Sequence, residues 1–267
     1  MPSTADSNAF GFEILYRHAE CIVVNKPSGL LTQSPPGIDS LENRIKQFLS
    51  AERKTDVEHI YLGIPHRLDR PASGAMIFAL RKRTARKLSK QFERHQIKKT
   101  YWACTIGEVR PPAGIWEDFI RKLPGIAESE IVADDHPEGQ RARLRYRTLA
   151  ARPDLSWLEI QLETGRTHQI RVQAAWRGYP LLGDKQYGAV LPFGKVTDDP
   201  RERAIALHAR RIQFRDPGLK QDADNAAIHQ TSTGADSQPS EETCWKIDGE
   251  LVTVTAPPPE PWRELGA

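Results

Sequence analysis

An aspartate between two arginines is the position in the sequence best suited to chemistry. Asp69 lies between Arg67 and Arg70. Pro71 and Gly74 follow, and because proline fixes its φ angle while glycine permits unusual backbone angles, we expect a rigid, irregular loop that aims the Asp69 carboxylate. Neighbouring arginines favour the ionised carboxylate, which suits a nucleophile better than a general acid. The alternative is a structural aspartate–arginine salt bridge that shapes a turn.

Two short apolar runs flank this loop. Residues 60–64 (IYLGI) precede it and residues 75–80 (AMIFAL) follow it. A short apolar run bounded by turn residues is typical of a buried strand. We therefore expect a strand on each side of Asp69.

The bulk composition is that of a soluble globular protein. The chain has 267 residues, of which 39% are hydrophobic and 27% charged, enough for one large domain or two small ones. No apolar run approaches a membrane span, and residues 1–8 lack a signal-peptide pattern, so we expect a cytoplasmic protein without a membrane partner. The cysteines are scattered and none forms a CxxC pair, so neither a disulfide nor a zinc site is expected.

Charge is distributed unevenly along the chain. Residues 81–99 hold nine basic residues and one acidic residue, whereas residues 216–242 hold six acidic residues and one basic residue. A basic face beside a separate acidic segment is typical of a nucleic-acid-binding protein. The alternative is a solvated helix face and an acidic loop.

Hydrophobic periodicity predicts an α+β fold with many strands and few helices. Strand patterns occur at residues 13–16, 21–26, 100–106, 141–149, 157–162, around 207–214 and at 250–255. Helical spacing occurs at residues 41–49 and 83–95, and a further helix is expected from Gly165 onward. In residues 141–149 four arginines alternate with other residues, which predicts a half-buried strand with a basic outer face.

Composition also indicates the domain limits. Residues 1–12 are expected to form a loose leader, residues 13–259 one continuous domain and residues 260–267 a tail. Residues 219–242 are mostly polar and nearly devoid of apolar side chains. Because such a stretch cannot bury enough surface to order itself, we expect a flexible insertion there.

Several blocks of sequence occur in a particular order. They are VNKPSGL at residues 24–30, HRLDRPASG at 66–74, KKTYWA at 98–103, TGRTHQIRV at 164–172 and GDKQYG at 183–188, with weaker matches in LHA at 207–209 and APPP at 256–259. In this order they resemble the RluA-type pseudouridine synthases, whose catalytic loop carries the signature HRLDxxTSG. The blocks extend over nearly the whole of residues 13–259.

This resemblance implies an activity, a fold and a partner. Members isomerise uridine in RNA to pseudouridine: the base leaves C1′, rotates and rejoins through C5, without a cofactor or metal. The implied pseudouridine synthase fold is a central, mostly antiparallel mixed sheet flanked by helices and loops, with the active-site cleft across it. We therefore expect a monomer that acts on ribosomal or transfer RNA, with the target uridine flipped into the pocket.

The resemblance also implies roles for four residues. Asp69 matches the catalytic carboxylate that starts the reaction at the ribose. Arg67 matches an arginine that enters the space left by the base and contacts phosphate, as a planar, permanently charged group can. Tyr101 matches a tyrosine that packs on the flipped uracil and accepts the C5 proton late in the reaction, although its pattern alone also fits a core residue. Arg171 matches the arginine that pairs with Asp69 and keeps it ionised.

Other polar residues in these blocks are expected to be structural. Arg166 and Arg171 differ by five positions, so on a helix only one of them should reach the pocket, and the resemblance selects Arg171. His66 and His168 are interpreted as hydrogen-bonding residues, and Lys26 as a residue that shapes a loop.

The sequence departs from the family pattern in several places. Ala72 stands where the family usually has threonine, and Asp216 with Pro217 replaces a more usual His-Pro pair. The polar insertion that follows is also unusual. An S4 RNA-binding domain is not expected ahead of Glu13, because only twelve residues precede it.

Two other functions remain as alternatives. A glycosidase would need a second carboxylate across the scissile bond from Asp69, and Glu163 is only a remote candidate. A non-catalytic RNA-binding protein of the same fold would use the basic helix and the arginine-rich strand equally well.

Overall fold

The computed structural model describes residues 6–219, 244–263 and 265. Its strands are β1 (Glu13–His18), β2 (Cys21–Lys26), β3 (Ser73–Ala79), β4 (Lys98–Ile106), β5 (Ala113–Lys122), β6 (Ser129–Val132), β7 (Gln140–Ala151), β8 (Leu155–Leu162), β9 (Leu207–Arg215), β10 (Trp245–Asp248) and β11 (Leu251–Thr255). Its helices are α1 (Leu41–Arg53), α2 (Lys82–Glu93), α3 (Gln169–Trp176) and α4 (Glu260–Arg263), with 3-10 turns η1 (Ser7–Phe10), η2 (Val57–His59) and η3 (Lys185–Tyr187).

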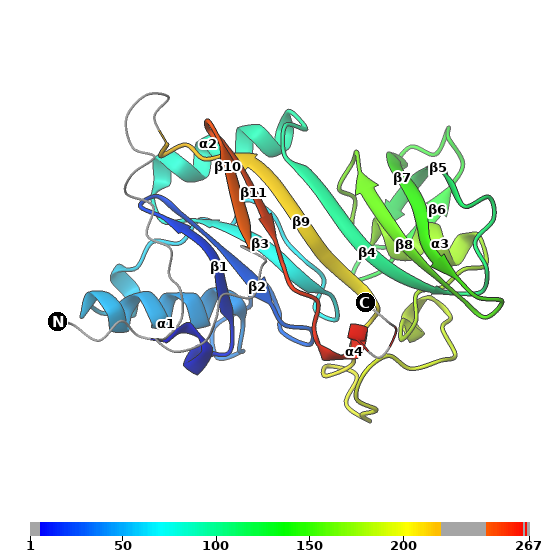
Figure 1. Cartoon of the computed structure of the whole chain (residues 1–267), viewed down its shortest axis with the longest axis horizontal. Helices are drawn as coiled ribbons and strands as arrows, with labels where there is room; N and C mark the ends of the chain where they lie inside the picture. The colour runs from blue at the N-terminus through cyan, green and yellow to red at the C-terminus, as the bar shows by residue number, and fades with distance from the viewer. Residues whose placement is uncertain (1–5, 220–243, 264, 266–267) are drawn as a thin grey trace.

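The strands form one sheet in the order β1-β2-β3-β9-β4-β8-β7-β5-β6, and β11 joins β10 to β9. Each of these pairs is antiparallel except that of β3 with β9. The long strands β9 and β4 cross the middle of the molecule, with β1–β3, α1 and α2 on one side and β5–β8 with α3 on the other (Figure 1). This arrangement confirms the α+β fold with a mixed, mostly antiparallel sheet.

Strand β3 is buried along its whole length, which explains its unbroken apolar sequence. Met76 and Phe78 pack in the cluster that contains Phe48 of α1. Ile77 points the other way and packs with Leu88 of α2. Because alternate residues of a strand face opposite sides, two helices cover the two faces of β3, and the strand that follows the Asp69 loop is held rigidly.

The parallel contact between β3 and β9 requires a glycine. Gly74 has φ of 118°, and a Cβ atom there would lie 2.5 Å from the backbone N of Ala209. Beside it, Ser73 Oγ lies 2.9 Å from Nδ1 of His208, whose Nε2 lies 3.2 Å from the carbonyl oxygen of Ala256. The sequence blocks that contain residues 73–74 and 207–209 therefore meet at one junction, which anchors the Asp69 loop.

Some predicted elements differ from those observed. Residues 60–64 do not form a strand: only Gly63 forms a bridge, in which its N–H and C=O both bond to Ala79, while Ile60 and Leu62 pack into the core. The helix expected from Gly165 begins at Gln169 instead. Strands β5 and β6 were not predicted, because their residues lack a clear alternation of polar and apolar side chains. Strand β10 was not predicted because it has only four residues.

The ordered fold extends beyond the expected limits of residues 13–259. Phe12 is buried, and its ring and that of Phe10 contact Phe48 at centroid distances of 5.7 and 5.8 Å. At the other end, Trp262 is fully buried, with its ring centroid 6.3 Å from that of Trp102. The insertion expected at residues 219–242 lies outside the described residues except for Leu219. Among the described residues, no helix is long and apolar enough to cross a membrane.

Asp216, one of the departures from the family pattern, is a buried anchor. The Tyr16 hydroxyl donates to its carboxylate at 2.7 Å and the Gly218 N–H at 2.8 Å. Nδ1 of His18 lies 3.1 Å from the same carboxylate. Asp216 therefore ties the end of β9 to strand β1, and its role is structural.

Candidate active site

A cleft of about 1060 Å³ crosses the sheet and brings the four predicted site residues together. The Asp69 loop and the start of α3 face each other across it, with Tyr101 of β4 between them and residues 125–127 of the β5–β6 turn at one side. Ligand sites in proteins occupy about 300–1,000 Å³. The cleft is therefore large enough for a nucleotide and its neighbours.

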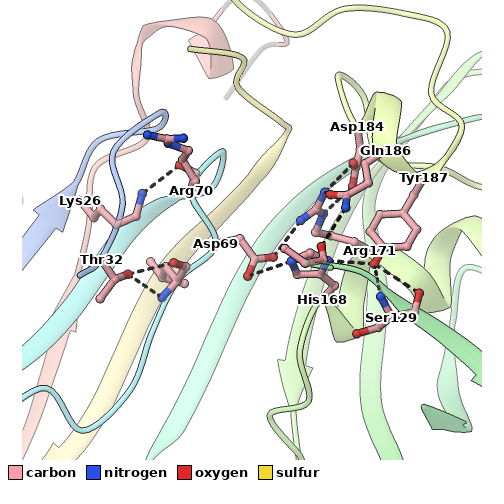
Figure 2. Close-up of polar contacts among 12 residues, drawn as sticks. Lys26, Thr32, Asp69, Arg70, Ser129, His168, Arg171, Asp184, Gln186 and Tyr187 are labelled. Carbon is pink, nitrogen blue, oxygen red and sulfur yellow. Dashed lines mark hydrogen bonds and ion pairs between the residues drawn. The ribbon is translucent and has the colours of Figure 1, made fainter. Parts of the chain in front are cut away.

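Lys26 holds the backbone of the Asp69 loop from below. Its side chain is fully buried, and Nζ donates to the carbonyl oxygens of Pro27, Arg70 and Ala72 at 2.8, 3.1 and 2.8 Å. Figure 2 shows the contact with Arg70. Burial lowers the pKa of Lys26 to about 7, and the nearby Asp69 carboxylate opposes this shift. The expectation that Lys26 shapes a loop is correct, and the loop it shapes is the one that carries Asp69.

Thr32 fixes the loop from its other side. Oγ1 of Thr32 donates to the carbonyl of Leu68 at 2.9 Å and accepts the N–H of Leu68 at 3.2 Å. Arg70 is tied in turn to Gly29, with its Nε donating to the Gly29 carbonyl at 3.1 Å and its own carbonyl accepting the Gly29 N–H at 2.8 Å. Both neighbours of Asp69 are thus anchored, so its side chain projects into the cleft from a fixed backbone.

Ala72 is buried within this loop at 1% exposure. Its N–H donates to the carbonyl of Asp69 at 3.1 Å, and its carbonyl accepts from Lys26. The hydrogen bonds of residue 72 are made by its backbone, which explains how alanine serves at a position where the family usually has threonine.

Arg171 is the charged partner of Asp69, as the sequence predicts. Its Nη1 donates to Oδ2 of Asp69 at 3.2 Å, and the arginine is itself only 3% exposed. A second carboxylate lies behind it: Nε and Nη2 donate to Asp184 at 2.7 and 2.8 Å, and Nη2 also donates to Gln186 at 2.7 Å (Figure 2). The guanidinium lies 4.9 Å from the ring centroid of Tyr187. The four hydrogen bonds and the ring contact hold the Arg171 guanidinium in one orientation, with Nη1 directed at Asp69.

His168 also faces Asp69, which the sequence did not indicate. It precedes α3 in the left-handed conformation, with φ of 53°. Its Nδ1 lies 2.8 Å from the hydroxyl of Tyr187, and its Nε2 lies 3.7 Å from Oδ1 of Asp69. Burial lowers the pKa of His168, so the ring is neutral near pH 7. The expected hydrogen-bonding role is present, and in addition the ring borders the carboxylate.

Tyr101 and Arg67 line the cleft, and neither side chain makes a hydrogen bond or ion pair to another described residue. Tyr101 is 7% exposed and lies on β4 beneath the Asp69 loop, and burial together with Asp69 raises the pKa of its phenol. Its hydroxyl makes no hydrogen bond to another described residue. Arg67 is exposed at the rim and makes no ion pair within the described part of the chain. Both side chains are therefore available to a bound molecule.

The other polar residues singled out in the sequence, His66 and Arg166, also line the cleft, but each has an internal hydrogen-bond partner. The expectation that only one of Arg166 and Arg171 reaches the pocket is therefore wrong. Arg166 lies in the loop before α3, where its Nε donates to the carbonyl of Arg141 at 3.0 Å, so the argument from helix faces does not apply to it. The Ile77 N–H donates to Nε2 of His66 at 3.1 Å, and burial with the neighbouring Lys99 lowers the pKa of His66 to about 3. His66 is thus a neutral acceptor that supports β3.

The arginines of β7 do not form a free basic surface. Arg141 and Arg143 pair with Glu117, and Arg147 pairs with Glu159 at 2.8 Å. Glu163 accepts from Arg143 and Arg145 and does not line the cleft, so it is not placed to act with Asp69 as a glycosidase would require.

Residues 20–176 match the sequence model of the family described as RNA pseudouridylate synthase. The chain belongs to this family. The resemblance inferred from the motifs is therefore confirmed, and the matched residues contain the loop of Asp69, the strand of Tyr101 and the whole of α3.

Named relatives agree with this membership. Over 206 residues the chain is 36% identical to the ribosomal large subunit pseudouridine synthase D of Borreliella burgdorferi, a match that covers 75% of this chain and 60% of that protein. Over 222 residues it is 30% identical to the tRNA pseudouridine synthase C of Haemophilus ducreyi, covering 77% and 86%. A solved structure, human RNA pseudouridylate synthase domain containing 4, has a similar fold with a TM-score of 0.63 at 24% identity, over 78% of this chain and 86% of that one. The match thus spans about three fifths of the length of the Borreliella relative.

Sequence reasoning missed Asp184 as the main partner of Arg171. The only signal for it was its place in the GDKQYG block at residues 183–188. A motif shows that a residue belongs to the family pattern, but the contact between two residues thirteen positions apart depends on how the chain turns after α3.

Proposed function

We propose that this chain isomerises uridine in structured RNA to pseudouridine, with Asp69 as the catalytic carboxylate. One observation carries the proposal above the others. Asp69 is the carboxylate in the cleft that a buried arginine, fixed by Asp184, holds at 3.2 Å. Such pairing keeps a carboxylate ionised and aimed while leaving one of its oxygens available to a substrate.

The ionised Asp69 starts the reaction at the ribose, by attack on C1′ or by removal of a sugar proton. Glycosidic cleavage frees the uracil, which turns within the cleft so that C5 replaces N1 as the atom bonded to C1′. Tyr101, on the cleft floor, packs against the ring and receives the C5 proton directly or through water. Its raised phenol pKa keeps the hydroxyl protonated at rest, so the hydroxyl gives its own proton to water in the cleft as it takes up the C5 proton.

A uridine within a paired RNA region must leave its stack to reach Asp69, at a cost of about a few kcal/mol. Arg67 at the cleft rim offsets part of this cost, because its guanidinium stacks in the vacated space and binds a backbone phosphate. Its exposure and lack of an ion pair in the described structure support this role.

The substrate class is ribosomal or transfer RNA. The named relatives include one enzyme of large-subunit ribosomal RNA and one of tRNA. We expect the protein to act as a monomer in the cytoplasm. The alternative of a non-catalytic RNA-binding protein leaves unexplained why a buried arginine would hold a carboxylate inside an anion-binding cleft, where it repels phosphate.

The test uses unmodified ribosomal RNA and tRNA transcripts labelled with tritium at uridine C5. We expect the wild-type protein to release the label to water and Asp69→Asn to release none. RNA affinity should survive the substitution, because a repulsive charge is removed from the cleft. Equal label release by both proteins would overturn the assignment of Asp69.

A further inference from the structure

A second hollow adjoins the active-site cleft where β8 separates from β4. It has a volume of about 720 Å³ and is lined by residues of β4, β7, β8, β9 and β11. Phe92, His95, Lys99 and Leu162 line both this groove and the cleft. The two hollows are therefore neighbours, and Lys99 stands at the passage between them.

Lys99 is an ammonium group without a counter-ion. The side chain is half-buried, and among the described residues it makes no hydrogen bond or ion pair. The arginines of β7 on the same groove are, in contrast, paired with glutamates. Burial lowers the pKa of Lys99. A partly desolvated cation of this kind is stabilised when an anion arrives.

Gly165 leaves room for this ammonium group. A Cβ atom at position 165 would lie 3.2 Å from Nζ of Lys99, with no other close atom. The φ angle of Gly165 is not in the left-handed region, so its backbone does not demand glycine. The glycine instead keeps the passage beside Lys99 open.

Further unpaired cations continue along the groove. Lys98 and Arg211 line it, and neither makes an ion pair within the described residues. Lys98 and Lys99 are successive residues of β4, and Arg211 is the β9 partner of Thr100 in the sheet register. Lys98, Lys99 and Arg211 all line this groove, and a cationic groove of this kind binds the phosphate backbone of a single strand.

We propose that Lys99 binds a backbone phosphate next to the target uridine, and that the flanking single strand of RNA passes from the cleft into the groove along Lys98 and Arg211. This inference rests on the proposed function for the identity of the RNA. The occupant is a polyanion because the unpaired side chains at the passage are cationic, and it is single-stranded because its base must be free to enter the cleft.

The test measures binding of a short single-stranded oligouridylate as a function of salt. For single strands, each phosphate contact contributes about 0.7 to the slope of log affinity against log salt. We expect Lys99→Met to lower the slope by about 0.7 and Lys99→Arg to preserve it. Lys195→Met is the matched control, because this exposed lysine lines neither hollow, and its slope should equal that of the wild type.

Steady-state label release from the transcript that the wild type modifies gives a second readout. Lys99→Met should raise KM with little change in kcat, because a phosphate contact is present in both ground and transition states. Gly165→Ala keeps the charge but displaces Nζ, so it should raise KM in the same way while its circular dichroism matches the wild type. A slope for Lys99→Met equal to that of the wild type, or a loss shared by Lys195→Met, would overturn the proposal.

The outcomes separate this inference from the proposed function. If neither the wild type nor any variant releases label, the isomerase assignment fails. In that case a salt slope that is lower for Lys99→Met than for the wild type and Lys195→Met still supports the phosphate contact. If label is released but the slopes of wild type and Lys99→Met agree, only the phosphate contact fails.

Discussion

Asp184 is bound to Arg171 more tightly than Asp69 is. Two nitrogens of the guanidinium donate to Asp184 at 2.7 and 2.8 Å, whereas one donates to Asp69 at 3.2 Å. Asp184 is 1% exposed, and the side chain of Asp69 is 26% exposed. The buried carboxylate therefore neutralises and orients the arginine, and the more exposed one is left free to react.

This relationship predicts the effect of Asp184→Asn. The substitution leaves a buried guanidinium without its main counter-charge, and breaking a buried ion pair from one side costs about 3–5 kcal/mol. We expect the free energy of unfolding in urea to fall by an amount in this range, and kcat for label release to fall because Arg171 shifts toward Asp69. Asp118→Asn is a comparison, since Asp118 pairs with the more exposed Arg177 at 2.8 Å. An equal loss of stability in the two variants would contradict the prediction.

Two buried histidines predict a loss of stability in acid. Burial lowers the pKa of His66 to about 3 and that of His208 to about 4, from an ordinary value of 6.5. Between pH 6.5 and about 4, the unfolded chain binds protons at these sites that the folded protein does not, so the free energy of unfolding decreases as pH falls. Each histidine contributes a slope of up to about 1.4 kcal/mol per pH unit.

The histidine prediction is checked by urea unfolding at a series of pH values. His208→Gln, which cannot take up a proton, should reduce the slope between pH 6.5 and 4 relative to the wild type. His59→Gln is the matched control, because the side chain of His59 is 73% exposed. A pH dependence unchanged in His208→Gln would contradict the argument.

Gly74→Ala should disturb the active site from outside the cleft. The added Cβ would lie 2.5 Å from backbone atoms of Ala209, at a φ angle that alanine rarely adopts. Since backbone cannot move aside without separating β3 from β9, we expect a loss well above the roughly 1 kcal/mol of left-handed strain alone. Gly37→Ala supplies that reference, because Gly37 has φ of 83° and no atom within 4 Å of its would-be Cβ. Thermal unfolding of the two variants measures the difference.

The sequence predicted the strands and helices that depend on the pattern of side chains within one segment. The alternation in residues 141–149 gives β7, with Ala142, Leu144 and Tyr146 buried, and it also predicted the arginine-bearing outer face. It did not reveal that glutamates of β5 and β8 neutralise that face, because cross-strand partners depend on pairing register. Strand β5, with its charged and half-exposed residues, owes its conformation to β7 and was missed for the same reason.

Part of the candidate site was also predicted, but from the family motifs and not from the pattern of side chains. Asp69 and Arg171 are 102 positions apart, and only their places in the family motifs connected them before the structure did so. Physical reasoning on the isolated loop left open a salt bridge with its own neighbours, but Arg70 is bound to Gly29 and Arg67 makes no ion pair among the described residues. The three carbonyls on Lys26 could not be foreseen, since hydrogen bonds to backbone leave no mark on residue type.

Lys26 provides a test of whether a rigid loop is needed for catalysis. Lys26→Met fills a similar volume but removes the donor shared by the carbonyls of Pro27, Arg70 and Ala72, and a buried polar group left unsatisfied costs about 1–3 kcal/mol. We expect residues 65–72 to exchange their amide hydrogens faster than in the wild type. kcat for label release should fall, because the Asp69 carboxylate is no longer held in one position. RNA affinity should be nearly unchanged, because the cationic surface of the cleft is preserved. Wild-type kcat in a variant with fast exchange in this loop would show that catalysis tolerates a mobile Asp69.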